Sequence, residues 1–425
     1  MELWNLELGS TMTDRDALYR AVLDNPDDDT LRLVYADAVE EAGDPRRAAF
    51  IRTRVELALL PEYDPGAIQA RYHDQKKKVD GGRWITELPP LPDGLSWARD
   101  PFRRGLPAAI QARDGAAFVA HADALFDLYP VEWLELADTL LKDTAELAAC
   151  PWLNRIRHLS LARGTSGPAV RRLLGSEHFE RLGSLHIGPQ MTTTATVNEI
   201  VRSRVFKELT ALSVQEDRRG GGAIAGQLAN LANPPKLTKL DLSSNRLTAE
   251  HLERLVAAPV LGAVEELDLS DNHLGSEGVA VLARAKLPNL RTLHLLRTRP
   301  TPGGVSVLVG AEFFRSLRSL SLGGNNLPSP AATWLAGAPA GNLRVLDLRE
   351  NRLGDRGAET LACSANLSGL LVLDLAESQL GATGADALAR SQTLAGLLYL
   401  NVYGNALPVD AAARLRKRFG DRVFL

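Results

Sequence analysis

Four aspartates occur in the same local sequence, each between two leucines: Asp241, Asp268, Asp347 and Asp374. If pairs of them lie on neighbouring strands about 4.8 Å apart, like charge raises the pKa of one carboxyl group or attracts a cation. Such a pair could dock a basic partner, hold a metal ion, or act as the acid and base of a glycosidase-like hydrolase. Because a glycosidase needs a cleft around its acids, and an open sheet offers none, we favour docking among these uses.

Other reactive residue types give weaker signals. Cys150 precedes Pro151, and Cys363 is expected at the end of a helix in a position that faces the core. None of the eight histidines has the HExxH spacing of a zinc site or a similar ligand spacing. We therefore predict no catalytic residue, no metal, no cofactor and no enzymatic activity.

Composition narrows the classes of protein further. The 49 Lys and Arg residues against 52 Asp and Glu give a net charge of −3, too balanced for a protein that coats nucleic acid or an anionic membrane. Two cysteines cannot form a disulfide framework, and no run of 18 apolar residues is present to span a bilayer. We expect a cytoplasmic monomer that binds a protein or peptide, and neither nucleic acid nor a membrane.

An internal repeat positions the aspartates. Its clearest copies read LTKLDLSSNRL from Leu237, VEELDLSDNHL from Val264 and LRVLDLRENRL from Leu343. Extending the same register yields further copies, with successive starts 25 to 28 residues apart. The eleven starts are Val131, Ile156, Leu182, Leu209, Leu237, Val264, Leu290, Leu317, Leu343, Leu370 and Leu397.

Each copy has the pattern of one short strand followed by one helix. Alternation in Leu240-Asp241-Leu242 turns both leucines inward and the aspartate outward. Residues 276–285, 355–363 and 383–389 have apolar residues at helical spacing behind plausible N-caps. Because one strand and one helix cannot bury their apolar faces alone, the units must stack, with strands inside the curve and helices outside.

A column of asparagines falls where each strand turns away. An amide there can donate to and accept from backbone groups that would otherwise be unpaired, and its loss should cost about 1 to 3 kcal/mol. Thr139, Thr298 and Ser378 can replace it only in part. The asparagines of the column are Asn245, Asn272, Asn325, Asn351 and Asn405. We interpret this column as structural.

The repeat resembles the leucine-rich repeat, in particular the ribonuclease-inhibitor-like type, over residues 131–407. The resemblance implies an α/β fold: a curved solenoid with a parallel inner sheet and outer helices. By analogy alone it permits an inhibitor or regulator that wraps a target enzyme.

A small all-α domain is predicted ahead of the repeats, with helices over residues 14–23 and 31–42 and a third from Pro45. The stretch LRLVYADAVEEAGDPRRAAFIRTRVELALLP from Leu31 resembles the repeat-companion domain of planctomycete and myxobacterial repeat proteins. That family usually has Trp and Glu where this chain has Ala38 and Ala49. Its polar motif residues form either a docking face or helix caps and a salt bridge, and we favour the second. They are Tyr35, Asp37, Asp44, Arg46 and Arg52.

These patterns divide the chain into five parts, after an extension, residues 1–11, that we expect to be disordered. The parts are a helical companion domain (12–88), a Pro-rich linker (89–101), an N-terminal cap (102–130), eleven repeats (131–407) and a C-terminal cap (408–425). The C-terminal cap should contain an amphipathic helix over residues 409–419 and a final strand.

The expected function is that of a non-catalytic protein-binding scaffold. The concave strands should hold the partner. Asp241, Asp268, Asp347 and Asp374 are called the acidic column below, and Lys239, Arg297 and Arg349 should neutralise part of its charge. Tyr399 and Tyr403 on the last strand, like Trp133 on the first, are either binding anchors or packing for the caps. The predicted partner-binding residues are Trp133, Glu135, His186, Asp241, Asp268, His294, Asp347, Arg349, Asp374, Tyr399, Asn401 and Tyr403.

Overall fold

The computed structural model describes residues 13–76, 84–139, 143–162, 166–188, 193–215, 222–231 and 233–425. The chain divides into two compact units, described separately below. The first unit is Met1–Met191 with Arg202–Glu208, and the second is Thr192–Val201 with Leu209–Leu425. The extension over residues 1–11 lies outside the described residues.

The first unit begins with four helices that start at polar caps. The Thr13 hydroxyl oxygen accepts a hydrogen bond from the Asp16 backbone N–H, and the Thr13 backbone N–H donates one to the Asp16 carboxylate. Asp28 and Asp44 cap the second and third helices through their carboxylates. The helices are α1 (Asp14–Asp24), α2 (Asp29–Glu41), α3 (Pro45–Leu59) and α4 (Pro65–Lys76).

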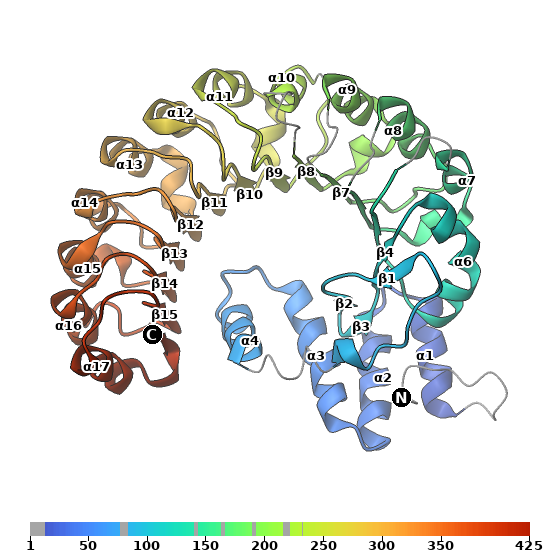
Figure 1. Cartoon of the computed structure of the whole chain (residues 1–425), viewed down its shortest axis with the longest axis horizontal. Coiled ribbons are helices and arrows are strands. Elements are labelled where there is room, and N and C mark those ends of the chain that lie inside the picture. The colour runs from blue at the N-terminus through green and yellow to red at the C-terminus, as the bar shows by residue number, and fades with distance from the viewer. Residues whose placement is uncertain are drawn as a thin grey trace. The chain divides into compact units, whose positions relative to one another are not determined.

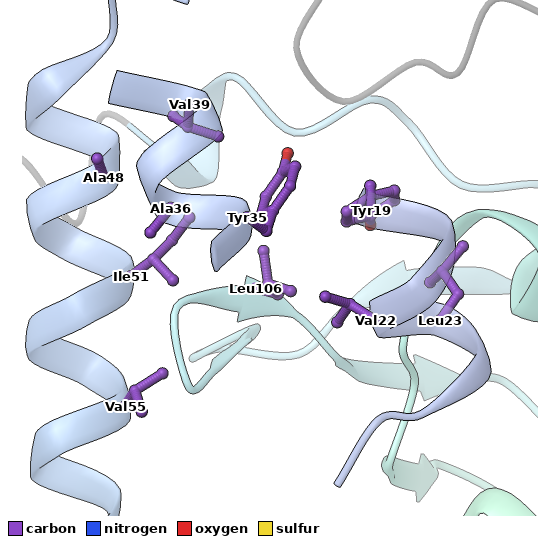
Figure 2. Close-up of a cluster of buried hydrophobic side chains, with 10 residues drawn as sticks. All are labelled: Tyr19, Val22, Leu23, Tyr35, Ala36, Val39, Ala48, Ile51, Val55 and Leu106. Atoms are coloured by element: carbon purple, nitrogen blue, oxygen red, sulfur yellow. The ribbon is translucent and has the colours of Figure 1, made fainter. Parts of the chain in front are cut away.

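These helices share a hydrophobic core with a hairpin from later in the chain. Figure 2 shows Tyr19, Tyr35 and Ile51 from three helices around Leu106. The hairpin consists of β2 (Phe102–Arg103) and β3 (Leu106–Pro107), with Arg104 and Gly105 in the left-handed region between them. A Cβ at Gly105 would overlap the backbone of Ile51, so only glycine allows this close approach.

Further contacts join the helices to the start of the repeats within the first unit. Tyr19 donates its hydroxyl to the Leu128 carbonyl at 3.0 Å, and Arg155 donates to the Leu23 carbonyl at 2.9 Å. Arg181 forms an ion pair with Asp27 at 2.8 Å. The helical region therefore packs as part of the first unit.

The sheet of the first unit begins inside the predicted linker. Strand β1 (Leu95–Trp97), within residues 89–101, pairs antiparallel with β4 (Ala109–Ala112). Parallel strands follow, namely β5 (Trp133–Leu136), β6 (His158–Leu161) and β7 (Ser184–Ile187). The connecting helices are α6 (Gly115–Leu128), α7 (Thr144–Ala148) and α8 (Gly167–Leu174).

In the second unit parallel strands line the concave side of an arc and helices its convex side (Figure 1). The strands are β8 (Ala211–Val214), β9 (Lys239–Asp241), β10 (Glu266–Asp268), β11 (Thr292–His294), β12 (Ser319–Ser321), β13 (Val345–Asp347), β14 (Val372–Asp374), β15 (Tyr399–Asn401) and β16 (Val423–Phe424). The helices are α9 (Thr194–Arg202), α10 (Ala223–Ala229), α11 (Ala249–Leu255), α12 (Gly275–Ala283), α13 (Pro302–Val309), α14 (Ser329–Gly337), α15 (Gly354–Ala362), α16 (Ala382–Arg390) and α17 (Val409–Phe419). The predicted fold class is thus confirmed: an α/β solenoid of parallel strands and outer helices, preceded by a small all-α region.

Short 3-10 helices complete the connections. They are η1 (Pro151–Arg155), η2 (Val205–Glu208), η3 (Pro259–Ala263), η4 (Glu312–Ser316), η5 (Ala365–Leu367) and η6 (Gly420–Arg422).

One leucine from each of the strands β9 to β15 forms the spine of the second unit's core. Leu240, Leu267 and Leu293 pair in register, and the series continues to Leu400. These leucines are at most 1% exposed. Since burying one leucine contributes about 1.5 to 3 kcal/mol, this spine is a principal source of stability in the unit.

The asparagine column forms the predicted structural ladder. Asn272 accepts from the backbone N–H groups of Asn245 and Leu247 in the preceding repeat, at 3.0 and 2.8 Å. Its amide donates to the carbonyls of Leu242 and Leu269, at 2.8 and 2.9 Å. Asn351 repeats this pattern. Each amide therefore forms hydrogen bonds with backbone groups in the turns of two adjacent repeats.

The helical segments predicted over residues 276–285 and 355–363 were expected to begin with Ser276 and Asp355 as N-caps, but both residues act differently. Ser276 lies inside α12, and its hydroxyl oxygen accepts from the Thr301 N–H of the next repeat at 2.9 Å. Asp355 lies inside α15 and accepts from the N–H groups of Gly381 and Gly384, at 2.6 and 2.9 Å. The interpretation as caps of their own helices was wrong, because glycine in the left-handed region starts each helix one residue earlier.

Candidate functional site

The acidic column is a straight row across the sheet of the second unit. Backbone pairing aligns Asp241 with Asp268 and Asp347 with Asp374, as the alternation predicted. The full aligned row is Ser213, Asp241, Asp268, His294, Ser321, Asp347, Asp374 and Asn401. Its four aspartates are partly exposed.

Each aspartate also has a structural contact that sequence reasoning missed. One oxygen of Asp268 accepts from the Ser270 backbone N–H at 2.8 Å, and Asp241, Asp347 and Asp374 accept likewise from the N–H two residues on. This hydrogen bond turns the backbone at the strand end. The sequence signal for it is the aspartate itself, because a short carboxylate reaches the N–H two residues ahead whether that residue is Ser, Arg or Ala.

Neutral donors occupy the second oxygen of three of these aspartates. The Ser213 hydroxyl donates to Asp241 at 2.7 Å, and the Ser321 hydroxyl donates to Asp347 at 2.8 Å. The Asn401 amide donates to Asp374 at 3.0 Å. Such donors orient the carboxylates without removing their charge.

One carboxyl group of each predicted pair has a raised pKa. Burial is the main cause for both Asp268 and Asp374, and repulsion from Asp241 or Asp347 adds to it. The predicted rise in pKa is confirmed. Desolvation exceeds the effect of like charge, because both carboxyl groups are largely buried.

The expected neutralisation of the column by three cations was mostly wrong. Lys239 pairs with Glu266 at 2.8 Å, and Arg297 pairs with Asp271 at 2.6 Å. Arg349 alone of the three contacts a column residue, Asp347, at 3.6 Å. Lys239 and Glu266 are paired in register on neighbouring strands, and Arg297 lies beyond the end of β11, so proximity in sequence does not decide the partner.

Replacing Asp268 with asparagine should raise the thermal unfolding midpoint at pH 7. The folded pKa of Asp268 lies above the unfolded value of about 3.9, so the native state binds the proton more tightly. Stability therefore falls as pH rises through the window between the two pKa values, and the ionised group destabilises the protein above it. Calorimetry at several pH values should show that the gain is largest at neutral pH and vanishes below pH 3. A gain that persists in acid would contradict burial as its cause.

Aromatic side chains follow the acids at the end of the sheet. Tyr403 lies two residues beyond the column and is 54% exposed, and its ring centroid is 5.7 Å from that of Phe424. Phe424 pairs in register with Asn401. Sequence reasoning predicted the final strand but did not include Phe424 in the site, although its place in the row followed from the alternation.

The three remaining site candidates belong to the first unit. Trp133 stacks on His158 with ring centroids 4.8 Å apart, and the Arg103 guanidinium lies 4.5 Å from the Trp133 ring. Glu135 accepts from Gln111 at 3.2 Å and occupies the same row as His186. Trp133 thus packs against His158 and Arg103 at the start of the repeats.

The polar motif of the leading helices is used in local contacts. Asp44 caps α3, and Arg52 forms ion pairs with Asp37 and Glu40 at 2.5 and 2.6 Å. Tyr35 is buried in the core. These contacts match the interpretation as caps and a salt bridge.

The thiols and possible metal ligands give no reactive centre in the part of the chain that the structure describes. Cys150 is buried, and burial raises its pKa. Cys363 is exposed at the end of α15, so its predicted position facing the core was wrong. Among the described residues, no three His, Cys, Asp or Glu side chains gather as a metal site would require. Nor does any helix within these ranges combine the length and hydropathy needed to cross a bilayer.

Curated relatives share sequence over part of the chain. The Tonsoku-like protein of Bos taurus is 39% identical over 159 residues, which are 34% of this chain and 11% of that protein. The Tonsoku-like protein of Mus musculus is 30% identical over 258 residues, 57% of this chain and 18% of that protein. The chain thus spans less than a fifth of the length of these relatives.

Solved structures show distant similarity. The crystal structure of the yeast Rad7 and Elc1 complex matches with a TM-score of 0.48 and 15% identity, over 96% of this chain and 91% of the matched one. An internalin (inlF) from Listeria monocytogenes matches with a TM-score of 0.39 and 19% identity, over 68% of this chain and 78% of the matched one.

A family model supports the repeat assignment directly. The model described as Leucine Rich repeat matches residues 233–255, 264–283 and 342–362, all within the second unit. These segments contain β9, β10 and β13 with the helices that follow them. The chain therefore contains leucine-rich repeats.

Proposed function

We propose that the protein is a non-catalytic scaffold that binds another protein or a peptide on the strand face of its second unit. The carrying observation is the aligned row from Ser213 to Asn401, which presents partly exposed polar side chains on its strands, apart from the buried Ser321. Nine strands at about 4.8 Å spacing give a face roughly 38 Å long. If the face is three rows of side chains wide, its area is comparable with the roughly 800 Å² that each partner buries in a standard interface.

Charge on this face favours a partner with a basic surface. Its strands carry five carboxylates, and two cations, Lys239 and Arg349, contact two of them. The five carboxylates are Asp241, Glu266, Asp268, Asp347 and Asp374. Complementary charge mainly sets selectivity and association rate, so binding should weaken with salt.

Affinity enrichment from the native lysate tests the proposal. In the test variant, Asp241, Asp268, Asp347 and Asp374 all become asparagine, which keeps an oxygen for the strand-end hydrogen bond while removing four charges. In the control, the exposed Glu250, Glu253, Glu277 and Glu312 become glutamine, which removes four charges from the helical side. We expect the test variant to lose the main captured protein by about tenfold or more, and the control to retain it.

Equal capture by the wild type and both variants would reject the acidic face as the binding surface. Loss of capture in the control alone would show that the partner binds on the helical side. Circular dichroism of each variant separates a lost contact from a lost fold.

The sequence is compatible with two other functions. An inhibitor that wraps an enzyme would use the same face, and it predicts a one-to-one complex in which the captured enzyme loses activity. A hydrolase with paired aspartates has less support, because one oxygen of each aspartate already accepts a backbone N–H at its strand end.

For the rest of the chain we propose the domain boundaries given by the sequence, with a repeat-companion domain over residues 12–88 and a cap at each end of the repeats. Trp133, Glu135 and His186 are proposed as additional partner contacts on the first unit. The cytoplasm is the proposed compartment.

A further inference from the structure

In the last strands of the second unit the first residue is a large apolar one, whereas in the preceding strands it is small or polar. The first residues of neighbouring strands form a row across the sheet. That row holds Ala211, Lys239, Glu266, Thr292 and Ser319, and then becomes Val345, Val372 and Tyr399. Val345 and Tyr399 are partly exposed, while Val372 between them is 5% exposed. Apolar surface on this sheet face is therefore concentrated over β13 to β15.

Acidic side chains lie beside these apolar ones. Asp347 and Asp374 occupy the next row of the same strands, and Asp374 accepts hydrogen bonds from two neutral donors, the Ala376 N–H and the Asn401 amide. Glu377 crosses over Gly404, because a Cβ at Gly404 would lie 2.7 Å from the Glu377 Cγ. The Glu377 backbone N–H also donates to the Tyr403 carbonyl at 2.8 Å.

Two exposed rings border the acids. Tyr403 and Phe424 are 54% and 50% exposed, and their rings contact each other in a tilted arrangement. Rings of this kind attract a cation over their faces, and their edges provide apolar contact for neighbouring side chains. The set Val345, Asp347, Val372, Asp374, Tyr399, Tyr403 and Phe424 is called the aromatic end below.

We propose that the aromatic end docks a segment of a partner protein in which an arginine or lysine is flanked by apolar side chains. This inference rests on the proposed function and specifies the chemistry of the partner at one place on the face. The cationic head meets Asp374 and the tyrosine rings, while its methylene stem and the flanking side chains lie against Val345 and Phe424.

Charge complementarity selects this occupant over an acidic or a purely apolar one. Asp347 and Asp374, with Glu377 beside the aromatic end, place three negative charges there, whereas Arg349, which lies 3.6 Å from Asp347 and also acts on Asp374, contributes one positive charge. An acidic segment would be repelled, and an uncharged apolar segment would leave the partly desolvated Asp374 without a cation.

Selection of a random dodecapeptide library on the full-length protein tests the proposal. Enriched peptides should contain arginine or lysine next to leucine, isoleucine, valine or an aromatic residue. Affinity of the best peptide should fall about tenfold in Asp374→Asn and in Tyr403→Ser. The control variant carries Glu277→Gln and Trp334→Ser, which remove an exposed acid and an exposed aromatic from the helical side, and it should bind within about twofold of wild type.

The outcomes separate this inference from the proposed function. Peptides whose binding depends on Asp241 or His294, and not on Asp374 or Tyr403, would leave the scaffold function standing and overturn the inference. Binders that depend on no strand-face residue would count against both. Enrichment of acidic peptides would also overturn the inference. So would a dimer of the protein, seen by analytical ultracentrifugation, that Tyr403→Ser dissociates, because a second copy would then be the occupant.

Discussion

Replacing Asn272 with alanine is expected to lower the free energy of unfolding by about 3 kcal/mol. Asn272 is fully buried and holds turns of two repeats through four hydrogen bonds of 2.8 to 3.0 Å. Without the amide, the N–H groups of Asn245 and Leu247 lose the acceptor that they share, and leaving a buried donor unsatisfied costs about 1 to 3 kcal/mol. Urea unfolding followed by circular dichroism measures the loss.

The matched control is Asn342→Ala. Asn342 is exposed and donates one bond, at 2.9 Å, to the Arg315 carbonyl. Water can replace that bond, so the loss should stay below about 1 kcal/mol. Equal losses in the two variants would show that the ladder contributes nothing beyond ordinary surface hydrogen bonds.

Gly105→Ala is expected to destabilise the first unit by about 3 kcal/mol. Gly105 has a φ of +81°, and a Cβ there would overlap the backbone of Ile51 in α3. The hairpin must then withdraw from the helices, which takes Leu106 out of the core shown in Figure 2. Thermal unfolding with probes in both units locates the effect.

Gly43→Ala separates backbone conformation from packing. Gly43 also has a positive φ, +96°, but a Cβ there meets no atom within 4 Å. It should cost only the left-handed penalty, about 1 kcal/mol. If Gly105→Ala lowers the free energy of unfolding by no more than Gly43→Ala does, the hairpin does not approach the helix as closely as described.

Local sequence was sufficient to predict the parts of the fold that repeat. Leucine alternation set the strand register, so the outward position of the four aspartates and their pairing on neighbouring strands were predicted. The asparagine ladder was predictable because an amide is the group that can serve N–H and C=O at one turn. The C-terminal helix over residues 409–419 followed from its amphipathic spacing.

Contacts between segments distant in sequence were not predictable in this way. Pairing of β1 within the presumed linker depends on β4, and the docking of Leu106 depends on three helices. Which carboxylate Lys239 or Arg297 contacts depends on side-chain direction within the neighbouring repeat. Burial decides the raised pKa of Asp268, and burial is a property of the assembled sheet.

Carbodiimide footprinting of carboxylates tests the binding face most directly. The full-length protein is labelled alone and in complex with the main protein captured from lysate, and modification is read by mass spectrometry. We predict that Asp241, Asp268, Asp347 and Asp374 lose labelling in the complex, while the exposed Glu250, Glu253 and Glu277 on the helical side keep it. Protection of those glutamates with unchanged labelling of the four aspartates would contradict the strand face as the place where the partner binds.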